Sequence, residues 1–137
     1  MKSIGVYLTF EGQCSAAIDF YQQVFKAELI SKKTFEESPM EAPEHLKDQI
    51  MHAEIKAGDF CLMASDNLMG MPTDGPGKVT LNIDLEDQQE QDRIFAALSE
   101  NGSVTMELQE TFWGARFGSL VDQFGIKWML HMTLPNS

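Results

Sequence analysis

Cysteines are scarce in this sequence, and long apolar segments are absent from it. Among its 137 residues are two cysteines, Cys14 and Cys61, whose spacing fits neither a CxxC pair nor a zinc-binding motif. Isolated cysteines among apolar neighbours are typical of buried, reduced thiols, so we expect a cytoplasmic protein. No apolar run is long enough to cross a bilayer, and the first ten residues are typical of a strand, so we expect no secretion signal.

Basic side chains are also few. Lys and Arg total 10 against 21 Asp and Glu, which gives a formal net charge of -11 at pH 7. Nucleic acids and anionic membranes are held mainly by clustered Lys and Arg. With so large an acidic excess, this chain is not expected to bind nucleic acid or a membrane surface. The acidic residues concentrate in segments 34–45 and 84–92, which we interpret as solvated surfaces.

Familiar catalytic motifs are missing too, including GxSxG, HExxH and a glycine-rich phosphate loop. Cys61 together with His52 is a conceivable nucleophile and base. No neighbouring residue in the sequence would lower the pKa of this thiol, so the pattern favours a structural role for Cys61.

What the sequence does contain is one order of elements that occurs twice. In the first half, Val6, Leu8 and Phe10 alternate with Tyr7 and Thr9, which predicts a half-buried strand. A segment with apolar residues at helical spacing follows, and three strand-like segments come after it. Because of the alternation, we expect Tyr7 and Thr9 to lie on the face of the sheet away from the helix.

The second half repeats this order from about residue 78. Val79, Leu81 and Ile83 are predicted to form a strand that packs on a helix, and Asp87 with Glu90 resembles the capping box that begins a helix. Three strands follow, with Trp128 and Leu130 on the helix side and Met129 and His131 on the other. We therefore predict a single domain, residues 1–137, made of two βαβββ modules at 1–66 and 77–137. A Gly- and Pro-rich segment joins them.

Several segments are similar to those of a known superfamily. "AAIDFYQQVF" after the first strand and "LVDQFGIKWML" near the end resemble the vicinal oxygen chelate proteins, which have the glyoxalase and bleomycin-resistance fold. "MHAEIKAGDFCLMASD" and "QETFWGARFGSLVDQFGIKWM" resemble its PhnB-like branch, and the resemblance spans nearly the whole chain. It implies an α+β fold of two βαβββ modules whose curled sheets form a cup, and it implies a homodimer.

Catalytic members of this superfamily hold a divalent metal with His, Glu or Gln on four strands. The resemblance places these positions at Tyr7, at Leu62 or Met63, at Lys78 and at Met129. None of these side chains is a good ligand for a hard divalent ion, so we expect no metal and no cofactor there. His52, Glu54 and His131 could form a different metal site only if their strands are neighbours.

These considerations give a set of candidate ligand-binding residues: Tyr7, Thr9, His52, Glu54, Met63, Trp113, Arg116 and Met129. Trp113 and Arg116 flank a predicted turn, where they could hold a planar or anionic molecule by stacking and a charged hydrogen bond. Alternatively, Trp113 fills the core or a dimer interface.

Two functional hypotheses follow from this set. The first is a PhnB-like protein without the usual metal ligands that binds a small organic molecule in its cup, much as bleomycin-resistance proteins do. The alternative is a metal-independent or atypical-metal enzyme of the glyoxalase/dioxygenase superfamily. In that case His52, Tyr7 or Glu54 would serve as acid–base groups.

The residues at the four metal positions lead to a prediction about metal content. The purified protein should contain no stoichiometric Zn²⁺, Ni²⁺, Mn²⁺ or Fe²⁺ and should not turn over a hemithioacetal, because phenol, thioether and ammonium groups bind hard ions poorly. Elemental analysis of protein purified without chelator, together with a glyoxalase I assay, checks this. One tightly held metal per chain would contradict it.

Overall fold

The structure is a computed structural model that describes residues 5–37, 42–66 and 79–135. It divides the chain into two compact units, Met1–Thr73 and Asp74–Ser137. The predicted linker, residues 67–76, lies outside the described residues. Within the described ranges, no helix has the length and apolarity that a membrane span requires.

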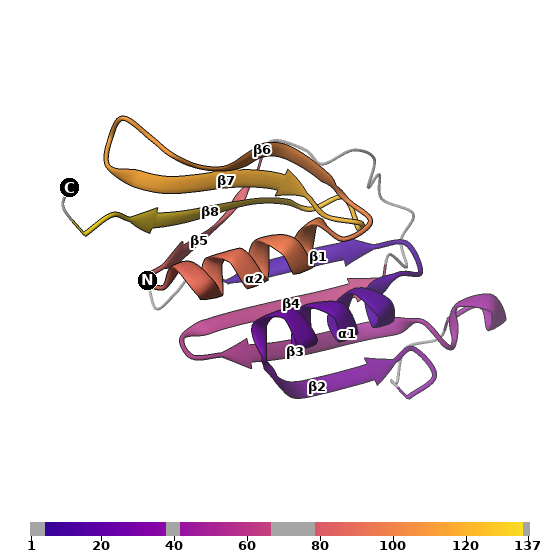
Figure 1. Ribbon diagram of the computed structural model, residues 1–137. Helices are drawn as coiled ribbons and strands as arrows, with labels where there is room; N and C mark the ends of the chain where they lie inside the picture. Colours follow the sequence, from indigo (N-terminus) through magenta and orange to yellow (C-terminus); the bar gives the residue numbers. More distant parts are fainter. Residues whose placement is uncertain (1–4, 38–41, 67–78, 136–137) are drawn as a thin grey trace. The chain divides into compact units, whose positions relative to one another are not determined.

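The first unit is a four-stranded sheet with one long helix. Its elements are β1 (Val6–Phe10), α1 (Cys14–Phe25), β2 (Glu28–Thr34), the short 3-10 helix η1 (Glu44–Leu46), β3 (Ile50–Ala57) and β4 (Phe60–Asp66) (Figure 1). The strand order is β1-β4-β3-β2. Strands β1 and β4 run parallel, and the other neighbours are antiparallel. The parallel pair brings the start of the unit beside its last strand.

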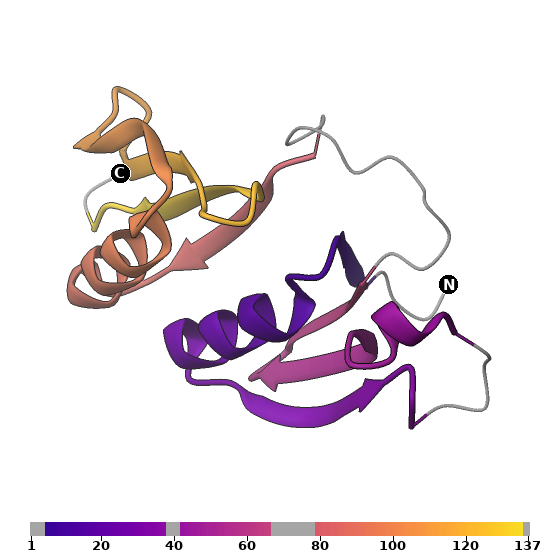
Figure 2. The same ribbon diagram turned by 90° about the vertical axis from the view of Figure 1, so that its right-hand side faces the viewer.

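Helix α1 covers one face of this sheet, as Figure 2 shows. The apolar spacing of the helix brings Ala17, Ile18 and Tyr21 into the core, where none of them is exposed. Buried residues alternate with more exposed ones along β3 and β4. The helix packs against the buried set, which includes Ala53, Ile55, Leu62 and Ala64. The other residues of each strand, including Tyr7 and Thr9 of β1, therefore lie on the helix-free face, as predicted.

A buried carboxylate at the end of β4 links three elements of this unit. Asp66 accepts hydrogen bonds from the backbone N–H of Cys14 at 3.0 Å and from that of Ile50 at 2.9 Å. These donors stand at the starts of α1 and β3. Asp66 thus fixes where the helix and the strand begin, and a buried acceptor with charge-assisted bonds is costly to remove.

The second unit repeats this architecture. Its elements are β5 (Leu81–Leu85), α2 (Gln88–Ser99), β6 (Ser103–Glu110), β7 (Ala115–Val121) and β8 (Lys127–Thr133), in the order β5-β8-β7-β6 (Figure 1). Strands β5 and β8 are parallel. The α+β fold of two βαβββ modules is therefore confirmed.

The core of the second unit forms on the helix side, with Trp128 and Leu130 buried as predicted. Asp122 stands in the turn between β7 and β8. It accepts from the backbone N–H groups of Phe124 and Ile126 and, at 2.7 Å, from the indole N–H of Trp128. One carboxylate thus shapes the hairpin and satisfies the buried indole.

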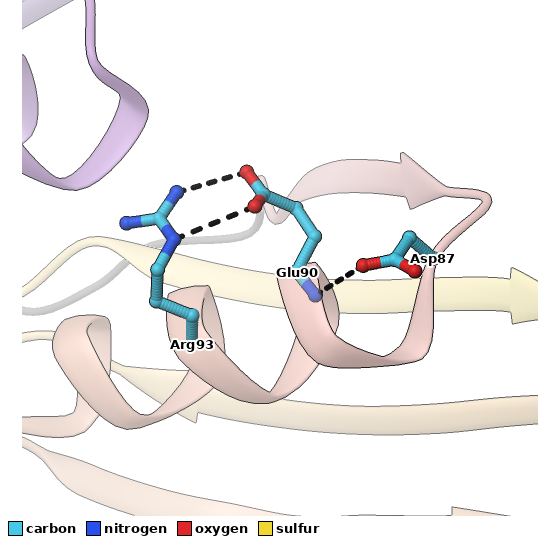
Figure 3. A network of polar contacts seen from close by, with 3 residues as sticks. All are labelled: Asp87, Glu90 and Arg93. Atoms are coloured by element: carbon cyan, nitrogen blue, oxygen red, sulfur yellow. Dashed lines mark hydrogen bonds and ion pairs between the residues drawn. The ribbon is translucent and has the colours of Figure 1, made fainter.

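One prediction about the start of the second unit needs correction. Val79 does not begin the strand or pack on α2: it is 72% exposed, and β5 begins at Leu81. At the start of α2, the Asp87 carboxylate accepts from the Glu90 N–H at 2.8 Å, which is the first half of the predicted capping box. The Glu90 carboxylate also forms an ion pair with Arg93, one turn along the helix (Figure 3).

Candidate ligand-binding faces

Three strands of the first unit contribute to one row of side chains on its helix-free face. Tyr7 is the partner of Met63 in the parallel pair, and Met63 is the partner of Glu54 in the antiparallel pair. The next row contains Thr9 and its partner Ser65. Continuing the register of β3 and β4 places His52 opposite Ser65. The five candidate residues of the first unit therefore share one face.

Aromatic side chains meet on this face. The rings of Tyr7 and His52 lie with centroids 6.0 Å apart and planes inclined by 40°, although a strand lies between their own strands. Tyr7 is half exposed. The two rings together offer an angled aromatic surface beside Met63, which suits the body of a small organic molecule.

A pocket of about 490 Å³ lies at one end of the same unit. Its lining contains both apolar and charged residues, namely Gly5, Val6, Glu54, Lys56, Asp59, Phe60, Cys61 and Met63. Two of these, Glu54 and Met63, were candidates from the sequence. Cys61 was weighed as a nucleophile and interpreted as a structural thiol. The pocket's volume lies within the range of small-molecule sites.

The thiol of Cys61 is held in its protonated form. Its Sγ donates to the Glu54 carboxylate at 2.9 Å, and this bond raises the pKa of Cys61, with burial and the negative charge of Glu54 acting in the same direction. The other thiol, Cys14, is buried, and burial raises its pKa to about 12. Neither cysteine has the lowered pKa of a nucleophile, in agreement with the structural role favoured by the sequence.

In the second unit, the helix-free face carries a different set of side chains. Asn82 is the partner of Met129, and Asp84 is the partner of His131, whose Nδ1 lies 3.4 Å from Asp84 Oδ1. Trp113 is 54% exposed and lies in the segment before β7, where its ring meets those of Phe112 and Phe117 at 5.0 and 6.2 Å. Trp113 does not fill the core of its own unit.

The interpretation of Arg116 as a free cation at a turn is wrong. Arg116 is the second residue of β7, and its side chain turns to the helix side. Its Nη1 donates to Gln91 Oε1 at 2.9 Å, and its Nη2 lies 2.8 Å from Asp92 Oδ1. Gln91, which is fully buried, in turn donates to the Arg116 carbonyl at 3.0 Å. Arg116 therefore fastens α2 to β7 and is not available beside Trp113.

The residues at the fold's metal positions do not fit a hard divalent ion. Strand register pairs Tyr7 with Met63 in the first unit and Asn82 with Met129 in the second. Lys78 lies outside the described residues. At the three expected positions that the structure describes, the side chains of Tyr7, Met63 (or Leu62) and Met129 offer no carboxylate or imidazole. His52 lies on β3 of the first sheet and His131 on β8 of the second, so the alternative site stays a prediction.

Two βαβββ units with this strand order define the glyoxalase-like fold. Solved structures of glyoxalase, bleomycin-resistance and dioxygenase proteins share it at 14% and 16% sequence identity, with TM-scores of 0.69 and 0.65. Residues 2–131 match the family described as 3-demethylubiquinone-9 3-methyltransferase. The chain belongs to this PhnB-like family, and its fold is the one that glyoxalase and bleomycin-resistance proteins share.

Individual relatives agree with this assignment. The YjdN protein of Escherichia coli is 35% identical over an alignment of 136 residues, and the match covers 92% of each chain. The solved structure of PA1353 from Pseudomonas aeruginosa is 37% identical with a TM-score of 0.85, and the match covers 96% of this chain and 99% of that one. The PhnB protein of Bacillus cereus is 25% identical with a TM-score of 0.81, over 96% and 100% of the two chains.

Replacing Arg116 should destabilise the second unit. In Arg116→Ala, the buried Gln91 amide loses a charged donor, so we expect a loss of about 1–3 kcal/mol in the free energy of unfolding. Arg93→Ala is the matched control, because it removes only an i,i+3 pair at the helix surface and should cost about 0.5 kcal/mol or less. Urea unfolding of both variants measures this. Equal stability of the two variants would contradict the assigned role.

Removing the Glu54 carboxylate should make Cys61 more reactive. In Glu54→Gln, the acceptor charge that stabilises the protonated thiol is lost, so the pKa of Cys61 falls and more thiolate is present at neutral pH. We expect alkylation by iodoacetamide to accelerate by about threefold or more. Asp59→Asn, a change in the same pocket without a bond to Cys61, should leave the rate unaltered. Mass spectrometry follows Cys61 separately from Cys14, and an unchanged rate in Glu54→Gln would refute the assigned contact.

Proposed function

We propose that this protein binds a small organic molecule on the helix-free face of its first unit. The observation that carries the proposal is the pocket of about 490 Å³ at one end of this unit, whose lining includes Met63, Glu54 and Lys56 from the helix-free face. A few placed polar groups within a partly apolar pocket are typical of ligand sites. The neighbouring Tyr7 and His52 rings extend the apolar surface.

A binding role, rather than the methyl transfer that the family description names, is what the described residues support. Enzymatic use of this face would need an activated group. Cys61 is held as a protonated thiol by Glu54, and the donor set at the metal positions does not suit a Lewis-acidic metal. Tyr7, Thr9, His52, Glu54 and Met63 are accordingly assigned to ligand contact.

The remaining candidates lie in the second unit. We propose that Trp113 offers its half-exposed ring to a ligand and that Met129, on the helix-free face of its sheet, contributes an apolar contact. Arg116 is withdrawn from the proposed ligand set, because its guanidinium group binds Gln91 and Asp92.

We also propose that the protein is a cytoplasmic homodimer. The dimer is supported by the sheet edges, since β6 is exposed along most of its length and presents Val104 and Met106, which are 39% and 42% exposed. The two unpaired cysteines support a reducing compartment. Light scattering at micromolar concentration tests the dimer, and a monomer mass would refute it.

A thermal-shift screen of small organic molecules tests the binding role. A ligand present at about 100 times its dissociation constant should raise the unfolding midpoint by roughly 5–10 °C. Met63→Ala should reduce this shift, because Met63 lines the pocket. Leu29→Ala removes an exposed apolar side chain of β2 outside the pocket lining and should leave the shift unchanged. A broad library without any stabilising compound would sink the proposal.

A further inference from the structure

Hydrogen-bond donors form an unbroken row across the helix-free face of the first unit. Lys33 of β2 is the partner of His52 of β3, and Thr9 of β1 is the partner of Ser65 of β4. The printed pairs of β3 and β4 end at Ala53 and Ala64, and extending them by one residue brings His52 opposite Ser65. The row therefore crosses all four strands with one ammonium group, one imidazole and two hydroxyls. It contains no carboxylate.

We infer that this donor row, Lys33, His52, Ser65 and Thr9, binds the acidic group of the ligand. The inference rests on the proposed function. It assigns the ligand to the class of small organic acids, which carry an oxyanion on an apolar or planar body. Two of the four residues, Lys33 and Ser65, were not candidates from the sequence. The Tyr7 ring, which meets His52 from the neighbouring row, is placed to contact the body of such a molecule.

The ion pairs of other basic side chains support this assignment. Four of them already have carboxylate partners within 4 Å: Lys32 with Asp19, Lys47 with Glu44, Arg93 with Glu90 and Arg116 with Asp92. Lys33 has no such ion pair in the part of the chain that the structure describes. The nearby Glu37 carboxylate interacts with Lys33 only at longer range, because it accepts from the backbone N–H and hydroxyl of Thr34.

The hydrogen bonding of the other three members of the row, Thr9, Ser65 and His52, also supports the inference. Among the described residues, no hydrogen bond engages the side chains of Thr9, Ser65 or His52. The carboxylate closest along the strand, Glu54, belongs to the next row and accepts from Cys61. In a chain with a net charge of -11, an anion needs a local group of donors. None of the four members of this row is a carboxylate, and an oxyanion there would receive charge-assisted hydrogen bonds from the neighbouring members that it reaches.

A matched set of probes tests the ligand class. Benzoate and phenyl phosphate carry an oxyanion, whereas benzamide and benzylamine have the same ring with a neutral or a cationic group. Of benzoate and phenyl phosphate, the one that binds more tightly should have an affinity at least about tenfold higher than benzamide or benzylamine. Calorimetry measures these affinities. Comparing benzoate with phenyl phosphate shows which oxyanion the row prefers. Equal affinities for anion and amide would overturn the inference.

Adjacent lysines of β2 provide the matched variants. Lys33→Ala should weaken binding of the anion by about three- to tenfold, since the contact is partly exposed to solvent. Lys32→Ala removes the same charge from the next residue, which pairs with Asp19 of α1, and should leave the affinity unchanged. His52→Gln keeps a donor and should weaken binding less than His52→Ala. Circular dichroism confirms that each variant is folded.

The outcomes separate this inference from the proposed function. If both lysine variants lose the same affinity, or if neither loses any, the donor row is not the anion site. Library hits without a preference for anions would leave the binding role intact and overturn the ligand class. If no library member and no probe binds, both proposals fail.

Discussion

Each four-stranded sheet has one helix to cover it, and the rest of the structure depends on this constraint. A helix can bury only one face of a sheet, so alternate residues of every strand are left on the other face. In the first unit the buried residues of β4 are Leu62, Ala64 and Asp66, and the residues between them line the helix-free face. The alternation therefore divides each strand into residues that stabilise the fold and residues that are available for binding.

Polar groups differ in their hydrogen bonding between the two faces. On the covered side they are satisfied: Asp66 accepts from two backbone N–H groups, and Gln91 is bonded to Arg116 in both directions. A buried polar group without a partner would be costly, so these positions are committed to the fold. On the helix-free face of the first unit, the donors of Lys33 and His52 carry no such commitment among the described residues. This contrast is the physical basis for placing the function there.

Much of the fold could be predicted from the sequence because alternation and helical spacing are local patterns. These patterns placed Trp128 and Leu130 in the core of the second unit. They placed Tyr7 on the helix-free face of the first unit. The role of Arg116 was missed although a signal existed, since Arg116, Gly118 and Leu120 are two residues apart and lie on one side of β7. The Arg was interpreted as a residue flanking a turn, and its contacts with Gln91 and Asp92 of α2 were not predicted.

Other features depend on pairing between distant strands. Strand β2 has irregular register with β3 at two places, between Leu29 and Ser31 and between Lys33 and Thr34. A bulge of this kind changes which residues share a face, so simple alternation along β2 could not place Lys33 beside His52. The Cys61–Glu54 contact likewise joins β4 to β3, and the register between these strands could not be predicted from the sequence. These residues were missed because their relation arises only in the folded sheet.

The central claim is that the helix-free face of the first unit holds the ligand. Amide chemical-shift mapping of the isotope-labelled protein, titrated with a compound that stabilises it, tests this claim most directly. The account predicts that the largest shifts fall on β1, β3 and β4, at Tyr7, His52, Met63 and their neighbours, with small changes along α1. Shifts concentrated on α1, or confined to the second unit, would contradict it.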